Sequence, residues 1–104
     1  MYLKALRIFD TAIIGAGPVG LFTIFQAGMN ELDACLLDSL STVGGQCSAL
    51  YAEKPIYDIP GFHKISAQGL IDNLKEQIAP FSYETFLNQT CLDLKHQDAI
   101  WHLQ

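Results

Sequence analysis

The sequence has few charges and little basic character. Charged residues make up 16% of its 104 residues, and the formal net charge is -5. Nucleic-acid-binding proteins need clustered Lys and Arg to neutralise phosphates, and no basic or aromatic-rich stripe is present. Half of the residues are hydrophobic, which is a globular composition with material for one small core. The negative net charge and the lack of a basic stripe argue against nucleic acid as a partner.

Paired cysteine spacing is also missing. The chain has three cysteines, an odd number without a C-x-x-C pair, which argues against a disulfide framework or a zinc site. Cys35 lies in an apolar run and Cys91 lies in an expected strand, and both are predicted to be small, buried side chains. The three histidines have no ligand spacing either, so we expect no metal site.

The longest stretch without charge spans residues 11–30 and has Lys4 and Arg7 upstream. On hydropathy alone such a run fits a signal peptide or a membrane anchor. Three glycines and Pro18 lie in its middle and would break a spanning helix, and Asp10 stands at its entrance. We therefore expect a cytoplasmic chain with no membrane partner.

The same stretch holds the most specific motif of the chain. Gly15, Gly17 and Gly20 form G-x-G-x-x-G directly after one apolar run and directly before a helical one. In this motif the first glycine permits a sharp turn, the second lets a pyrophosphate approach the backbone, and the third lets helix and strand pack closely. Asp38 ends the next apolar run, where its side chain is placed to bind a ribose or simply to cap the strand. The context predicts a dinucleotide-binding βαβ unit.

Hydrophobic periodicity accordingly predicts an α/β fold, a Rossmann-like unit on a parallel sheet. Residues 9–14 should form the first strand, buried on both faces, and residues 34–37 the second. Pro18 suits the first turn of the intervening helix, which should run to about residue 29 and end at a left-handed Asn30. Its expected core-facing side chains are Leu21, Phe22 and Phe25.

The second half of the chain opens with residues 39–63, a long segment without a clear period. Loops of that length in a compact domain usually carry function. Ser66 can cap a second helix that ends before Pro80 and presents Leu70, Ile71, Leu74 and Ile78 on one face. Strands are then expected over residues 83–87, 91–94 and 100–103, with a turn at residues 95–98. The last two strands should begin an antiparallel β-meander that is truncated.

Three further stretches resemble one protein family. Residues 43–47 read VGGQC, residues 50–51 read LY, and residues 56–62 read IYDIPGF. Together with the glycine loop they resemble ferredoxin–NADP reductases of the thioredoxin-reductase-like type (type 2), which are flavoproteins with two dinucleotide domains. Ala52, Pro55 and His63 depart from the usual pattern of the family. None of these departures removes a polar contact that the family makes with its cofactor.

The resemblance implies an FAD site and no catalytic side chain, since the flavin carries the chemistry. The glycine loop would hold the FAD pyrophosphate, and Asp38 would bind the adenosine ribose. Backbone groups at Cys91 would face the adenine. At the other end, Gly44 and Gly45 would let the backbone approach the cofactor, Gln46 would hydrogen-bond near the ribityl chain or ring, and Tyr51 would stack on the isoalloxazine. The implied cofactor-binding set is Gly15, Gly17, Pro18, Gly20, Asp38, Gly45, Gln46, Tyr51 and Cys91.

By the same resemblance, the parent enzyme moves a hydride from NADPH to FAD and passes electrons singly to ferredoxin or flavodoxin, as a homodimer. Residues 1–104 would be the N-terminal part of a split FAD-binding domain, without the NADPH domain and the C-terminal FAD segment. Two dinucleotide domains need roughly three times this length. The isolated chain is therefore expected to be an inactive fragment.

Two alternatives remain open. The chain would also fit a segment of a thioredoxin-reductase-like disulfide reductase, whose C-x-x-C would lie in the other dinucleotide domain. The run GGQC also resembles the redox-active stretch of glutathione-reductase-like proteins, in which a second cysteine follows five residues later. That position is Ala52 here, so Cys47 is not expected to be a redox centre. A non-catalytic ADP- or dinucleotide-binding module would explain the glycine loop and Asp38 equally well, although it leaves residues 44–61 without a role.

Overall fold

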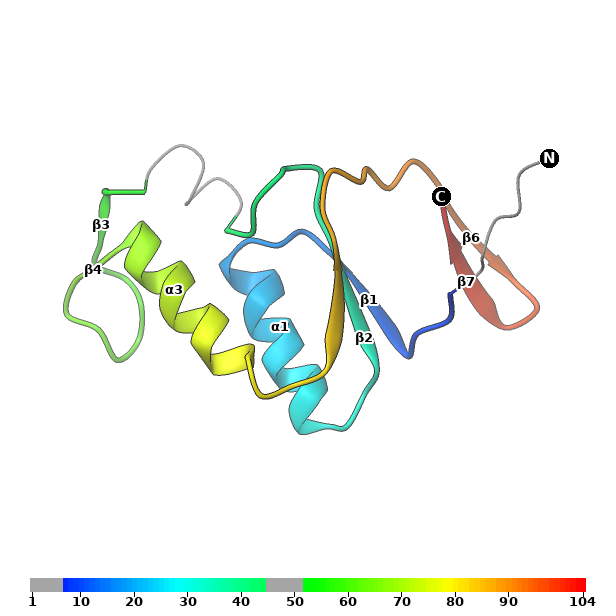
Figure 1. Ribbon diagram of the computed structural model, residues 1–104, viewed down its shortest axis with the longest axis horizontal. Helices are drawn as coiled ribbons and strands as arrows, with labels where there is room; N and C mark the ends of the chain where they lie inside the picture. Colours follow the sequence, from blue (N-terminus) through cyan, green and yellow to red (C-terminus); the bar gives the residue numbers. More distant parts are fainter. Residues whose placement is uncertain (1–6, 45–51) are drawn as a thin grey trace.

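The computed structural model describes residues 7–44 and 52–104, and its centre is a three-stranded parallel sheet. The strands β1 (Thr11–Ile14), β2 (Ala34–Leu37) and β5 (Tyr83–Phe86) lie in the order β1-β2-β5. Thr11 pairs with Ala34, and Ala34 pairs with Tyr83. The helices α1 (Pro18–Met29) and α3 (Ala67–Ile78) pack against each other on the same side of this sheet (Figure 1). The α/β, Rossmann-like prediction is confirmed.

The core lies between the helices and the central strand β2. Ala34, Cys35 and Leu36 of this strand are all buried, because β2 has a neighbour on each side. Burying one Leu or Ile side chain contributes about 1.5–3 kcal/mol, so the packing of α1 and α3 holds the unit together. The buried cluster comprises Ala16, Leu21, Ile24, Ala27, Ala34, Leu36, Leu70, Ile71, Leu74 and Ile78.

The strand β1 is less buried than its apolar sequence predicted. Ala12 and Ile14 are exposed, the latter to 58%. Within the described residues β1 pairs with β2 alone, and the helices cover one face of the sheet. The expectation of burial on both faces is therefore wrong in this structure, because an edge strand with one covered face buries only alternate side chains.

The helix α1 has the expected bounds but a different inner face. Leu21 and Ile24 are buried, whereas Phe22 is 42% exposed and stacks on Phe25 with 5.5 Å between ring centroids. At 3.6 residues per turn, Phe22 lies off the stripe that Leu21 and Ile24 define. Asn30 has φ -99° and ψ 11°, so the left-handed residue at this helix end is Glu31, with φ 57°.

The helix α3 follows the sequence prediction closely. The Ser66 hydroxyl accepts a hydrogen bond from the Gly69 N–H at 3.0 Å, and the expected apolar face is buried. Two short strands precede the helix, β3 (Pro55–Ile56) and β4 (Ile65–Ser66), which pair antiparallel. This pairing ties part of the long segment before α3 to the start of the helix.

The chain ends in an antiparallel hairpin of β6 (Leu94–Gln97) and β7 (Ile100–Leu103). The start of an antiparallel pair is thus confirmed, but the expected strand at residues 91–94 and turn at 95–98 are wrong. The turn consists of Asp98 and Ala99, with φ 56° and 61°, which is the two-residue geometry that suits strand twist. The polar residues before it belong to β6, where His96 packs on Trp101 across the strands at 4.6 Å between rings.

Neither α1 nor α3 has both the length and the apolar character needed to cross a lipid bilayer, and no other helix in the described residues does.

Candidate dinucleotide-binding site

The turn from β1 into α1 depends on Gly15. Its φ of +110° lies in the left-handed region that side chains other than glycine rarely adopt. Its N–H donates to the Leu37 carbonyl at 2.7 Å, so it also continues the pairing with β2. The predicted sharp turn at this glycine is present.

Gly20 allows the first turn of α1 to lie against the end of β1. A Cβ built on Gly20 would stand 1.8 Å from the Gly15 carbonyl oxygen and 3.5 Å from Cγ2 of Ile13. Both neighbours belong to the strand or its exit, and the nearer one is backbone. The close helix–strand approach expected of the third glycine is therefore a feature of this structure.

Gly17 differs from Gly15 and Gly20, because neither its backbone conformation nor its surroundings require a glycine. Its φ is -79°, an ordinary value, and a Cβ built on it meets no atom within 4 Å. Neither backbone strain nor protein packing thus accounts for a glycine here. A residue without a side chain at this point leaves the backbone accessible to a bound group, which is the role that the motif assigns to its second glycine.

The N-terminus of α1 has no side-chain cap. Gly17 is the N-cap, Pro18 occupies the first turn, and no acidic residue stands there to neutralise the helix dipole. The first N–H groups of a helix have no intrahelical partner, and together with the dipole they attract anions. The local chemistry therefore suits a phosphate group held by backbone N–H donors.

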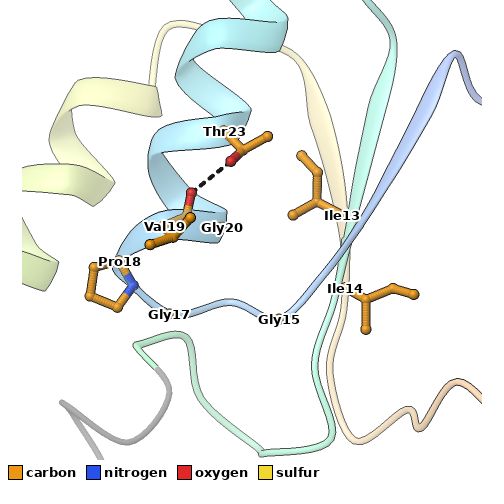
Figure 2. Close-up of a pocket in the computed structure, with 8 residues that line it drawn as sticks. All are labelled: Ile13, Ile14, Gly15, Gly17, Pro18, Val19, Gly20 and Thr23. Atoms are coloured by element: carbon orange, nitrogen blue, oxygen red, sulfur yellow. Dashed lines mark hydrogen bonds between the residues drawn. The ribbon is translucent and has the colours of Figure 1, made fainter.

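A depression of about 350 Å³ adjoins this helix end (Figure 2). None of its lining side chains is charged, and the Thr23 hydroxyl donates to the Val19 carbonyl at 2.7 Å. Any attraction for an anion at this edge therefore comes from backbone groups. The lining residues are Ile13, Ile14, Gly15, Gly17, Pro18, Val19, Gly20 and Thr23.

Asp38 lies directly beside the glycine loop. Its half-buried carboxylate accepts hydrogen bonds from the Ala16 N–H at 2.7 Å through Oδ2 and from the Leu40 N–H at 2.9 Å through Oδ1. The sequence placed Asp38 at the strand end, and the structure brings it to the loop. The hydrogen bond from the Leu40 N–H is the capping contact that the sequence suggested, and the ribose contact stays a prediction.

The remaining predicted site residues fall in two groups. Gly45, Gln46 and Tyr51 lie outside the described residues, as does Cys47. Cys91 lies ahead of β6 and is half-buried, so its expected place as a buried strand residue is wrong. Its Sγ lies 3.6 Å from the Asp93 carbonyl oxygen, as a weak donor. The backbone contact of Cys91 with an adenine stays a prediction.

Cys35 is buried, as expected from its apolar run. Burial raises the pKa of its thiol, and the negative charges of Glu84 and Asp33 add to this effect while Arg7 opposes it. In residues 7–44 and 52–104, no three His, Cys, Asp or Glu side chains come together in a way that would hold a metal ion.

Two contacts at this site were not foreseen from the sequence. The Gly44 N–H donates to the Ala16 carbonyl at 2.7 Å, and Gly44 has φ +124°. The Gln89 N–H donates to the backbone carbonyl of Asp38 at 2.9 Å. A glycine at position 44 was a visible signal of special backbone geometry, but nothing in the sequence indicated which carbonyl its N–H would meet.

The fold is that of thioredoxin reductases of known structure. The structure matches thioredoxin reductase from T. acidophilum with a TM-score of 0.78 at 19% identity, covering 92% of this chain and 30% of that one. The enzyme from Streptococcus pyogenes matches with a TM-score of 0.79 at 23% identity, again covering 92% of this chain and 30% of that one. At such low identity the likeness shows the fold alone, which is thioredoxin-reductase-like and Rossmann-type.

Sequence comparison identifies the family to which the chain belongs. The chain is 63% identical over 75 residues to the ferredoxin–NADP reductase of Anaplasma phagocytophilum, covering 72% of this chain and 22% of that protein. It is 54% identical over 95 residues to the ferredoxin–NADP reductase of Rickettsia akari, covering 91% of this chain and 28% of that protein. No protein-family model matches the chain. The chain belongs to the ferredoxin–NADP reductase family as a partial segment, spanning about a quarter of the length of these relatives.

Proposed function

We propose that this chain forms part of the FAD-binding domain of a ferredoxin–NADP reductase. In this proposal the glycine loop binds the FAD pyrophosphate, Asp38 binds the adenosine ribose, and backbone groups near Cys91 face the adenine. Gly45, Gln46 and Tyr51 serve the flavin end. The observation that carries the proposal is Gly17, where a glycine is explained neither by strain nor by packing and stands at an uncapped helix N-terminus.

The residues of the site fit the adenosine diphosphate half of such a cofactor. Backbone N–H groups at the start of α1 would neutralise the pyrophosphate without a basic side chain. The half-buried Asp38 carboxylate has accepted two hydrogen bonds and can accept about four, so it can also bind ribose hydroxyls. These groups bind and orient one end of the cofactor.

In the parent enzyme the bound flavin would accept a hydride from NADPH and pass electrons singly to ferredoxin or flavodoxin. The whole enzyme would be a cytoplasmic homodimer with a split FAD domain and an inserted NADPH domain. This chain has one glycine loop and no second dinucleotide motif. The residues present would therefore bind nucleotide without turning over NADPH.

The test is a calorimetric titration of the chain with ADP and with FAD. Gly17→Ala places a methyl group where the phosphates should lie and should weaken ADP binding by about tenfold or more, equivalent to about 1.4 kcal/mol. Its thermal stability should change by less than about 1 kcal/mol, because the new Cβ meets no protein atom. Gln77→Ala, on the exposed side of α3, is the control and should bind like the parent chain.

Two results would contradict the proposal. One is a parent chain that binds neither ADP nor FAD, and the other is a Gly17→Ala variant with undiminished affinity for ADP. Reduction of an acceptor by this chain with NADPH would refute the expectation that it lacks turnover.

A further inference from the structure

The peptide groups of Ala16 are held from two directions by the segment that follows β2. Its N–H donates to Oδ2 of Asp38 at 2.7 Å, and its carbonyl accepts from the Gly44 N–H at 2.7 Å. Ala16 is fully buried, so water does not compete for either group. We call this three-residue arrangement of Ala16, Asp38 and Gly44 the Ala16 clamp. It fixes the middle of the glycine loop to an element far away in sequence.

Asp38 is itself held on several sides. Its N–H donates to the Phe86 carbonyl at 3.0 Å, and its carbonyl accepts from the Gln89 N–H at 2.9 Å. Its Oδ1 accepts from the Leu40 N–H at 2.9 Å. A carboxylate anchored in this way presents Oδ2 to Ala16 at a set position. Hydrogen bonds of a carboxylate to backbone N–H groups are also stronger than those between neutral groups.

We propose that Asp38 is a positioning residue for the phosphate loop, in addition to any contact it makes with the ribose. Through Ala16 its carboxylate holds the loop in the shape that presents the N-terminus of α1 to a phosphate. This inference rests on the proposed nucleotide site. A loop that is already ordered does not have to be ordered at binding, and this raises affinity without a further ligand contact.

The Ala16 N–H is engaged by the carboxylate and is therefore not a phosphate donor in this arrangement. The donors for the anion are the N–H groups in the first turn of α1, at Val19 and Gly20, because Pro18 has none. The clamp thus acts on the orientation of these donors and does not touch the phosphate.

Binding of two nucleotides can distinguish a positioning role of Asp38 from a direct contact of Asp38 with the ribose. ADP has both ribose hydroxyls, and 2′,3′-dideoxy-ADP has neither. Asp38→Ala removes both carboxylate oxygens, so neither the Ala16 N–H nor the Leu40 N–H keeps its side-chain acceptor. If Asp38 positions the loop, this variant should bind 2′,3′-dideoxy-ADP about fivefold or more weakly than the parent chain does. If Asp38 acts on the ribose alone, its affinity for this nucleotide should be unchanged.

Asp10→Ala provides a matched control. Oδ2 of Asp10 accepts from the Asp33 N–H at 2.7 Å, which is the same kind of contact at the other end of β2. This variant removes a carboxylate–backbone hydrogen bond without touching the glycine loop. It should bind both nucleotides like the parent chain, even where its loss of stability equals that of Asp38→Ala.

A second measurement needs neither ligand nor variant. Nuclear magnetic resonance of the isotope-labelled chain should show a scalar coupling across the hydrogen bond between the Ala16 nitrogen and the Asp38 carboxyl carbon, with slow exchange of the Ala16 amide. Absence of this coupling together with fast exchange would overturn the clamp, as would unchanged binding of 2′,3′-dideoxy-ADP to Asp38→Ala. Failure of the parent chain to bind ADP would instead refute the proposed function, and the resonance measurement would still decide on the clamp.

Discussion

Replacing Gly20 with alanine should destabilise the fold, and the structure gives the reason. The new Cβ would stand 1.8 Å from the Gly15 carbonyl oxygen and 3.0 Å from its carbon. These atoms must separate by about 1 Å or more, and neither is the end of a flexible side chain. Gly15 is fixed by its φ of +110° and by its hydrogen bond to Leu37.

The magnitude follows from two opposing effects. Over-packing costs typically about 1–3 kcal/mol, and contact with backbone at this distance belongs at the upper end of that range. Alanine regains up to about 1 kcal/mol through its higher helix propensity. The net loss should be about 2 kcal/mol, which corresponds to a fall in melting temperature of about 8–16 °C for a domain of this size.

The assay is thermal unfolding followed by circular dichroism without ligand. Gly17→Ala is the matched control, because it adds the same methyl group in the same loop, where no atom lies within 4 Å. It should melt within a few degrees of the parent chain. A Gly20→Ala variant as stable as Gly17→Ala would refute the reasoning, since it would mean that α1 can move away from β1 at little cost.

Two further predictions concern the rest of the fold. Ser66→Ala removes the hydroxyl that accepts from the Gly69 N–H, and urea unfolding should show a loss of about 1 kcal/mol in the free energy of unfolding. Ser66→Asp retains an acceptor and should lose less stability. Equal losses in the two variants would contradict the capping role. For Cys35, burial raises the thiol pKa in the folded state, so above the ordinary thiol pKa the folded chain keeps a proton that the unfolded chain releases. Stability should therefore fall as pH rises through that window, and Cys35→Ala should show a smaller fall between about pH 7 and about pH 10. Equal pH slopes for the two proteins in urea unfolding would contradict this.

Much of the fold could be predicted because local pattern and final packing agree. The bounds of α1 follow from Pro18 and the uncharged run behind it, and the inner face of α3 follows from apolar residues at helical spacing after Ser66. The hairpin shows the limit of the same reasoning. The run KHQD resembles a turn by composition, yet residues 95–97 form a strand because His96 packs on Trp101 in the facing strand.

For the site, the sequence by itself determined the glycine loop, the helix that follows it and the presence of Asp38 at the end of the next strand. These features are local, since each depends on residue type and spacing along the chain. Only the tertiary structure decided that the Asp38 carboxylate and the Gly44 N–H meet on the two sides of the Ala16 peptide. It also decided that, among the described residues, β1 pairs with β2 alone and leaves side chains such as Ile14 exposed. Contacts of this kind depend on which elements become neighbours in space, and the order of residues along one segment does not specify that.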